Sequence, residues 1–198
     1  FYLKNIHCKL NYVYIIINIC IQRFIMKNKK VFSRTIDITC YEDEQDSVII
    51  EGEIKDTRLC HYYLVTGERK EPGILHNMKI TMKVSGNSLT ISDIHVEMIH
   101  YPREECIEAN KNIQKLNGLS ITKGFTKAVK DIIGGTRGCT HVANCILAMA
   151  PAAVQGFWAH KAQKPVTKEF ANQGSMSHYL VDTCYVWRKD GPMIKKLS

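Results

Sequence analysis

The stretch HNMKITMKVSGNSLTISDIHVEM, residues 76–98, decides the fold because it holds two apolar alternations separated by turn-forming residues. Every second residue of its first half can lie on one side of a strand, namely His76, Met78, Ile80, Met82 and Val84. Residues 85–88, Ser-Gly-Asn-Ser, have the composition of a turn. The stretch therefore predicts a β-hairpin.

The second half of this hairpin changes the phase of its alternation. Leu89 and Ile91 follow one phase, whereas Ile94, Val96 and Met98 follow the other. All five can face the core only if the strand absorbs an extra residue between the two groups. We therefore predict a β-bulge at residues 92–93.

A second hairpin is expected upstream, on either side of the acidic segment 42–47. Apolar residues alternate with polar ones before and after this segment; they are Phe32, Ile36, Ile38 and Cys40, then Val48, Ile50 and Ile54. Residues 57–73 read as a loop between the two hairpins. Together, the two hairpins predict four antiparallel strands.

The rest of the chain has helical spacing. Residues 102–117 begin with Pro102 and predict a first helix, with an apolar stripe of Cys106, Ala109, Ile113 and Leu116. Residues 122–133 predict a second, with Phe125, Val129 and Ile132 buried. A third follows residue 140, with Val142, Ile146, Met149, Ala153 and Phe157 buried, and Pro151 is expected to kink or split it. Strands followed by helices, without βαβ alternation, predict an α+β fold with about three helices on one face of a four-stranded antiparallel sheet.

The ends of the chain differ from this central part. Residues 1–25 contain no acidic residue, glycine or proline, and Met26 is the first methionine, so we interpret this segment as an upstream extension outside the fold. Its apolar run is too short to span a bilayer, although an amphipathic interfacial anchor is an alternative. Residues 26–198 are expected to form one domain with a polar linker at about 161–174 and a strand within 177–187.

Composition limits the possible partners. The net charge of +8 falls to +5 without residues 1–25, and the basic residues are scattered among acidic ones, so nucleic acid is not an expected partner. No membrane partner is expected, and no protein partner is identified. Six cysteines follow Met26 without the spacing of a secreted disulfide scaffold, which favours reduced thiols in the cytoplasm.

The stretch GGTRGCTH, residues 134–141, is the main candidate for function. Gly135 and Gly138 can expose backbone N–H groups, Arg137 adds donors, and a helix N-terminus follows, an arrangement that suits a carboxylate or phosphate. Alternatively, the glycines only cap and connect two helices, with Arg137 paired to a surface acid.

Thiol and imidazole groups in the same stretch also suit zinc or iron. We expect Cys139 and His141 to lie near Cys106 at the helix starts and to form a metal site. Further ligands could come from His76, Asp93 and Cys184. Each of these residues could instead be part of the core or surface, and the sequence contains no C-x-x-C pair to decide between the two.

A second hypothesis treats Cys139 as a catalytic nucleophile, with His141 or His76 as the base and Arg137 holding a small carboxylate or acyl substrate. Spacing alone identifies no acidic residue that would orient the histidine. A third hypothesis is a non-catalytic ligand-binding or interaction module in which the cysteines fill the core.

Several separated motifs resemble the bacterial family of unknown function DUF2889. They are SRTI at 33–36, IEGEIKDT at 50–57, HNM at 76–78, Tyr101-Pro102 with Cys106, residues 134–141, DTCY at 182–185 and DGP at 190–192. The resemblance implies a small bacterial cytoplasmic protein and supplies no reaction. The family usually has His-Asp-Met where this chain has His76-Asn77-Met78, which leaves the role of that acid open here.

The order of strands, a cysteine near one helix start and a Cys/His pair at a later one is also faintly similar to iron-sulfur cluster assembly scaffolds. Those proteins carry a further cysteine in a turn between strands, and residues 85–88 contain none. Their late pair is His-Cys, whereas this chain has Cys139-Thr140-His141. The similarity therefore concerns the fold more than the activity.

Overall fold

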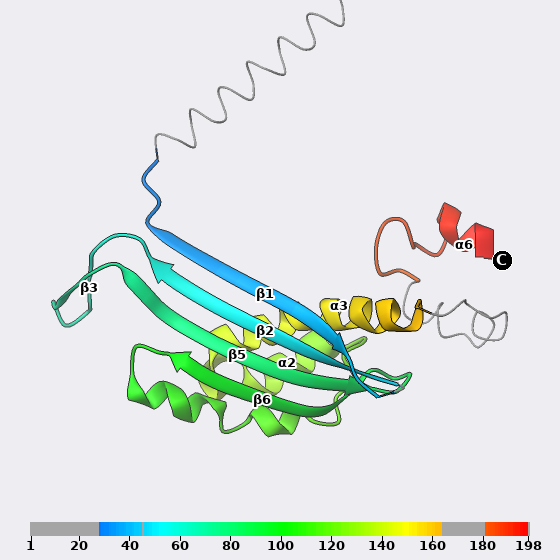
Figure 1. Ribbon diagram of the computed structural model, residues 1–198, viewed down its shortest axis with the longest axis horizontal. Helices are drawn as coiled ribbons and strands as arrows, with labels where there is room; N and C mark the ends of the chain where they lie inside the picture. The colour runs from blue at the N-terminus through cyan, green and yellow to red at the C-terminus, as the bar shows by residue number, and fades with distance from the viewer. Residues whose placement is uncertain (1–27, 45, 164–180, 198) are drawn as a thin grey trace, which may run out of the picture. The chain divides into compact units, whose positions relative to one another are not determined.

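The computed structural model describes residues 28–44, 46–163 and 181–197. Its main feature is a four-stranded antiparallel sheet in the order β1-β2-β5-β6, which follows the order of the strands along the chain (Figure 1). The strands are β1 (Phe32–Glu42), β2 (Ser47–Arg58), β5 (Gly73–Ser85) and β6 (Thr90–His100). The two predicted hairpins and the α+β fold are confirmed.

The register of β5 with β6 confirms the predicted bulge. Lys83 pairs with Asp93, whereas the next residue, Val84, pairs with Ile91. Ser92 is thus the extra residue, and Leu89, Ile91 and Ile94 are all buried despite their change of phase. A second shift, which the sequence did not predict, lies between Asn77 and Met78.

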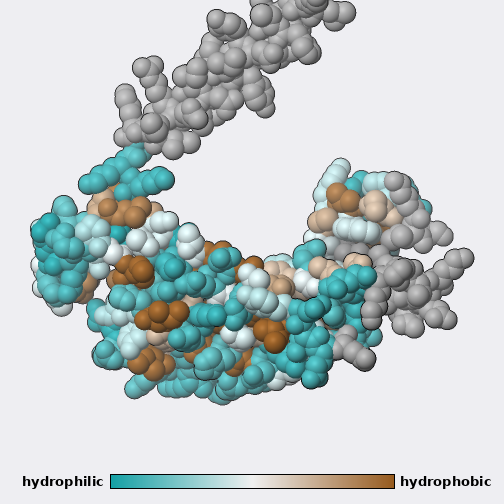
Figure 2. Space-filling model, in the orientation of Figure 1, coloured by the Kyte–Doolittle hydropathy of each residue, from teal (hydrophilic) through white to brown (hydrophobic). Residues whose placement is uncertain are grey.

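The helices cover one face of the sheet. They are the α-helices α2 (Phe125–Ile133) and α3 (Thr140–Lys161), with the short 3₁₀ helices η1 (Glu104–Asn110), η2 (Ile113–Leu116) and η3 (Gly135–Arg137). Inward-facing strand residues and helix residues form one core, which includes Ile50, Ile54, Ile80, Met82, Ile94, Val129, Ile146 and Met149. The opposite face carries ion pairs such as Lys79–Glu51, and Figure 2 shows it as largely hydrophilic with scattered hydrophobic residues.

Helix α3 approaches the sheet closely because glycine occupies the contact positions. A Cβ atom added to Gly156 would lie 2.5 Å from Cβ of Cys40 on β1. A Cβ atom added to Gly52 on β2 would lie 2.7 Å from Sδ of Met149. All five residues predicted to be buried in this helix are buried. By length and composition α3 could cross a bilayer, but a buried core helix meets the same criteria.

The predictions for the first two helices need correction. Residues 102–117 do not form one α-helix but the 3₁₀ helices η1 and η2, because the chain must return along about 36 Å of β6, farther than the roughly 24 Å that the same residues cover as an α-helix. The return is marked by the side chain of Gln114, which donates to the carbonyl of Ile94, and by the Gly118 N–H, which donates to that of Ile91. In α2, Ile133 is fully buried, whereas Ile132 is only partly buried.

Pro151 does not split α3, which runs unbroken from Thr140 to Lys161. The proline lies on the exposed side of the helix, where water can bond the carbonyl that a proline leaves without a donor. The remaining end of the chain also differs from expectation. Residues 181–187 form turns and bends where a strand was predicted, and a short helix, α6 (Pro192–Leu197), follows. The predicted extension at 1–25 and most of the predicted linker lie outside the described residues.

The chain divides into two compact units. The larger comprises Arg34–Thr57 and Ile74–Ser198, and contains most of the sheet and the helices. The smaller comprises Phe1–Ser33 and Arg58–Gly73. Within its described part, β3 (Tyr62–Tyr63) pairs with β4 (Arg69–Lys70) in a small hairpin that the sequence did not predict.

Candidate metal centre

Four polar side chains from four elements meet at one end of the sheet. Arg34 comes from β1, Asp56 from the end of β2, His76 from the start of β5, and His141 from the first turn of α3. Asp56 and His76 occupy inward-facing positions in the alternation of their strands, and Arg34 lies in phase with the half-buried Ile38 and Cys40 of β1. The sheet therefore directs them toward the N-terminus of α3, where His141 lies.

Asp56 is the centre of this cluster, and only 2% of its surface is exposed. Arg34 donates to both of its carboxylate oxygens, from Nε to Oδ1 at 2.6 Å and from Nη2 to Oδ2 at 2.8 Å. Such a bidentate pair compensates for the burial of the charge. These hydrogen bonds from Arg34 lower the pKa of Asp56 below its usual value, although burial acts in the opposite direction.

Both histidines approach the same carboxylate oxygen. Nδ1 of His76 lies 3.1 Å from Oδ2 of Asp56, and Nε2 of His141 lies 3.2 Å from it. The imidazole rings are stacked, with centroids 3.8 Å apart and planes 30° apart. Their side chains are 15% and 23% exposed, so the cluster reaches solvent along its histidine side.

The environment of His141 favours its neutral form. Burial lowers the pKa of this imidazole below its ordinary value, and the neighbouring His76 acts in the same direction, whereas Asp56 opposes both. A neutral imidazole keeps a nitrogen lone pair. His141 can therefore serve either as a metal ligand or as a base near neutral pH.

Cys139 lies beside the cluster but on the other side of the His141 ring. Its Sγ is 3.7 Å from Nδ1 of His141, whereas the opposite ring nitrogen, Nε2, faces Asp56. Because the two nitrogens point away from each other, Cys139 cannot join a metal ion held by Nε2. It can instead accept the Nδ1 proton or donate its thiol proton to Nδ1.

The three residues Asp56, His76 and His141 form a group that could hold a metal ion. One ligand atom from each lies within 4.8 Å of the ligand atoms of the other two. Among the described residues, this is the group of at least three histidine, cysteine, aspartate or glutamate side chains whose ligand atoms come this close together. Bonds of about 2.1 Å separate neighbouring ligand atoms by about 3.0 Å in octahedral and 3.4 Å in tetrahedral sites. The distances of 3.1 and 3.2 Å from Oδ2 to the two nitrogens fall in this range.

The orientation of the rings would have to change on metal binding. An imidazole nitrogen binds a metal through a lone pair that lies in the plane of its ring. Two rings stacked at 3.8 Å with planes 30° apart do not both point at one nearby ion. Both side chains are partly exposed, which leaves room for the rings to turn.

The other ligands expected from the sequence are not part of this group. Cys106 is half-buried in η1, and Cys184 is exposed in the segment before α6. Asp93, in the bulged region of β6, accepts a hydrogen bond from the backbone N–H of Ile94. The structure thus brings together His76 and His141, places Cys139 next to them, and leaves these three elsewhere.

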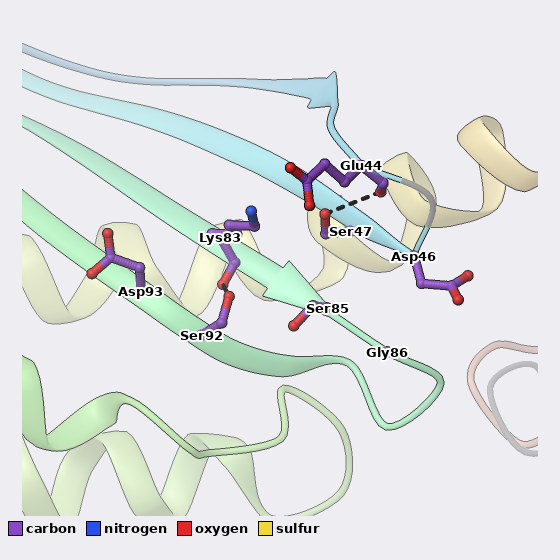
Figure 3. Close-up of a pocket in the computed structure, with 8 residues that line it drawn as sticks. All are labelled: Glu44, Asp46, Ser47, Lys83, Ser85, Gly86, Ser92 and Asp93. Atoms are coloured by element: carbon purple, nitrogen blue, oxygen red, sulfur yellow. Dashed lines mark hydrogen bonds between the residues drawn. The ribbon is translucent and has the colours of Figure 1, made fainter.

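Asp93 instead lines a shallow depression at the other end of the sheet (Figure 3). This depression is formed by the first residues of β2, the end of β5 and the bulge; its lining residues are Glu44, Asp46, Ser47, Lys83, Ser85, Gly86, Ser92 and Asp93. Lys83 forms an ion pair with Asp43 at 2.7 Å and, with Ser47, lowers the pKa of Asp43 to about 2. The acidic turn between β1 and β2 is therefore already partly neutralised.

The loop at residues 134–138 has a structural role. Arg137 donates from Nη2 to the carbonyl of Lys130 in the last turn of α2. Gly135 has a φ of 58°, and a Cβ atom at Gly138 would lie 2.5 Å from the carbonyl oxygen of Ile133. These contacts explain both glycines and the arginine as parts of a helix connection. That this loop binds an anion stays a prediction.

Sequence reasoning did not identify Asp56 or Arg34. A usable signal was present, since Asp56 continues the inward-facing series of β2 that includes Ile50 and Ile54. A charged residue at such a position needs a partner. Asn77, which follows His76 on β5, is buried, and its side chain helps to lower the pKa of Glu53.

The comparisons with known proteins identify a family. The family model described as "Protein of unknown function (DUF2889)" matches residues 32–155, a range that includes Arg34, Asp56, His76 and His141. No curated protein and no solved structure matches the chain.

Proposed function

Because the chain belongs to the DUF2889 family, whose description assigns no activity, we propose a function from the geometry of the site: the protein binds a divalent transition-metal ion through Asp56, His76 and His141. The observation that carries this proposal is the approach of two imidazole nitrogens to one carboxylate oxygen, at 3.1 and 3.2 Å. Two histidines and one carboxylate are a ligand set that zinc and iron both accept.

The surroundings of the three ligands support this proposal. Arg34 holds Oδ1 of Asp56, which orients the carboxylate while Oδ2 faces the histidines. Cys139 faces Nδ1 of His141 and can fix the tautomer that presents Nε2 to the metal. Outer contacts of this kind typically orient metal ligands and tune the affinity of the site.

Three protein ligands leave at least one coordination position for a water molecule or substrate. Because both histidines are partly exposed, we expect that position on the solvent side of the cluster. A metal there would supply Lewis-acid chemistry, and an iron ion could also supply redox chemistry. Three ligands with an accessible side favour a catalytic or substrate-binding site over a closed structural one.

The test is a metal titration of the full 198-residue chain, purified without an affinity tag and stripped of metal with a chelator. We expect one Co²⁺ or Zn²⁺ per chain in the wild type and at least a tenfold weaker affinity in His76→Ala and His141→Ala. The matched control is His95→Ala, because His95 is exposed on β6 outside the cluster. A folded wild type without bound metal, or ligand variants that retain wild-type affinity, would contradict the proposal.

A second candidate function is a cysteine-dependent enzyme acting on a small carboxylate or acyl compound. It is favoured by the order of groups, with Cys139 Sγ 3.7 Å from Nδ1 of His141, and Nε2 of His141 3.2 Å from Asp56. In this hypothesis Asp56 would be the orienting acid that sequence spacing did not reveal. Thiol, imidazole and a third polar group occur in this order in cysteine nucleophile sites.

The two candidates use opposite tautomers of His141. A base for Cys139 needs a free Nδ1 and a proton on Nε2, whereas a metal ligand needs a free Nε2. Alkylation by iodoacetamide in the presence of a chelator distinguishes them, read at individual cysteines by peptide mass spectrometry. Fast modification of Cys139 that slows in His141→Ala favours the enzyme, and the inert reference is Cys145, whose burial raises its pKa to about 11. If metal binding and fast alkylation are both absent, a non-catalytic module is favoured.

A further inference from the structure

The charges around the proposed metal ion indicate that the site also binds an anion. This inference rests on the proposed metal binding. A divalent ion would join one carboxylate, Asp56, and one guanidinium, Arg34. Among the described residues, Asp56 is the carboxylate that pairs with both Arg34 and His141, so it contributes the single negative charge counted here. With neutral histidines, the loaded site would carry two positive charges in excess.

Such an excess is costly in a half-buried site, because desolvation disfavours unpaired charge. Asp56 is almost completely buried, and the two histidines are less than a quarter exposed. A neutral water molecule can fill an open coordination position but reduces the charge only if it loses a proton. An anionic ligand can do both.

Arg34 is placed to bind the same ligand. Its side chain is 34% exposed, and two of the five N–H groups of an arginine are bonded to Asp56. The guanidinium therefore reaches solvent while it is held against the carboxylate that would bind the metal. The planar fork of donors matches the paired oxygens of a carboxylate or phosphate.

We propose that the metal site takes a small oxyanion, a carboxylate or a phosphate group, which binds the metal ion through one oxygen and Arg34 through another. The class of substrate is then a small anionic compound that enters along the exposed side of His76 and His141. This anion site differs from the one expected from the sequence at residues 134–138, where Arg137 is engaged with the carbonyl of Lys130.

The proposal requires that metal and anion strengthen each other's binding by the same factor. In the wild type, acetate or inorganic phosphate should tighten Co²⁺ binding at least tenfold relative to chloride of equal ionic strength. Arg34→Gln loses a contact that orients Asp56 as well as a repelling charge, so its own Co²⁺ affinity in chloride is the reference for its gain from the anion. Its gain from the anion should fall to less than threefold.

The experiment is a Co²⁺ titration of the full chain, followed by the visible absorption of the bound ion, in chloride, acetate and phosphate. Binding of Co²⁺ by each anion without protein is measured separately and subtracted. Acetate and phosphate as separate arms show whether the site prefers a carboxylate or a phosphate. Arg34→Lys, which keeps the charge, should retain part of the coupling, and circular dichroism verifies that each variant is folded.

Arg137→Gln is the matched control, and its coupling should equal that of the wild type. Metal binding that neither anion strengthens would overturn this inference and leave the proposed function standing. Unchanged coupling in Arg34→Gln, or coupling lost only in Arg137→Gln, would also overturn it. If the wild type binds no Co²⁺ in any of the three salts, the proposed function itself fails.

Discussion

Oδ2 of Asp56 lies 3.2 Å from Nε2 of His141, which joins the end of strand β2 to the first turn of helix α3. The contact lies at the edge of the core, because Asp56 is buried and continues the row of inward-facing residues of β2 that includes Ile50 and Ile54. The same pair therefore links the stability of the sheet–helix interface to the chemistry of the site. Each role can be tested separately.

Replacing Asp56 with asparagine should destabilise the protein. The change keeps the shape of the side chain but removes the charge that Arg34 contacts at 2.6 and 2.8 Å. We expect the free energy of unfolding to fall by about 2 kcal/mol, less than for a fully buried pair because Arg34 reaches solvent. Urea unfolding of metal-free protein measures the change. Asp37→Asn, at an exposed position of β1, should change it by less than about 0.5 kcal/mol, and equal losses in both variants would contradict this account.

Gly138→Ala should disturb the connection between α2 and α3. The added Cβ atom would lie 2.5 Å from the backbone oxygen of Ile133, which cannot move without shifting the end of α2. We expect a loss of about 1–3 kcal/mol in the free energy of unfolding. Gly73→Ala is the control, because a Cβ atom there meets nothing within 4 Å. If Gly138→Ala proved as stable as the control, the packing reason for this glycine would be wrong.

Gly52→Ala should be destabilising in a way that depends on Met149. The added Cβ atom would lie 2.7 Å from Sδ and 2.9 Å from Cγ of that side chain, which is fully buried. We expect a cost of about 1–3 kcal/mol for the single change. In the background Met149→Ala the same change should cost at least about 1 kcal/mol less, since the two closest overlaps are gone and only the contact with Sγ of Cys145 at 3.0 Å remains. Additive losses in the double variant would show that the two residues do not constrain each other.

Stability should fall as the solution is acidified below neutral pH. The pKa of His141 is lowered in the folded state, so between the folded and unfolded pKa values the unfolded chain binds a proton at this histidine and the folded protein does not. The free energy of unfolding therefore decreases as pH drops through the ordinary histidine value of 6.5 toward the lower folded value, and levels off below it. Asp56, whose pKa is also lowered, adds a second loss below its ordinary value of 3.8.

Urea unfolding between pH 5 and 8 with a chelator present checks the first of these losses. The variant His141→Gln should show a smaller decrease than wild type over this range, because it lacks the group responsible. His95→Gln serves as the comparison at an exposed position. If the free energy of unfolding fell as much or more in His141→Gln as in wild type over this range, the assignment to His141 would be wrong.

Metal binding should not depend on Cys106 or Cys184. Neither residue belongs to the group formed by Asp56, His76 and His141, and Cys184 is exposed. Cys106→Ser and Cys184→Ser should therefore bind Co²⁺ within about twofold of wild type, as measured by the same titration. A tenfold loss in either variant would show that the site draws on the cysteines expected from the sequence.

Much of the fold was accessible from the sequence because its signals are local. The alternation of apolar residues in 76–84 predicts a strand with one face in the core. The change of phase between Ile91 and Ile94 predicts one extra residue in the next strand, which the structure places at Ser92. The 3₁₀ form of residues 104–116 was not accessible in this way. It depends on the length of β6, along which the chain must return, and not on the residues of the segment itself.

The candidate site divides along the same line. The sequence by itself determined that His76 shares one face of a strand with Met78 and Ile80 and that His141 lies at the start of a helix, since these follow from periods of two and 3.6 residues. The same period of two places Asp56 in the inward-facing series of β2, although sequence reasoning did not single it out. Only the tertiary structure decided that Arg34, Asp56, His76 and His141 meet, while Cys106 and Cys184 stay outside their group. Strand order and the close approach of α3 at Gly52 and Gly156 set these distances, and both arise from packing between segments far apart in the chain.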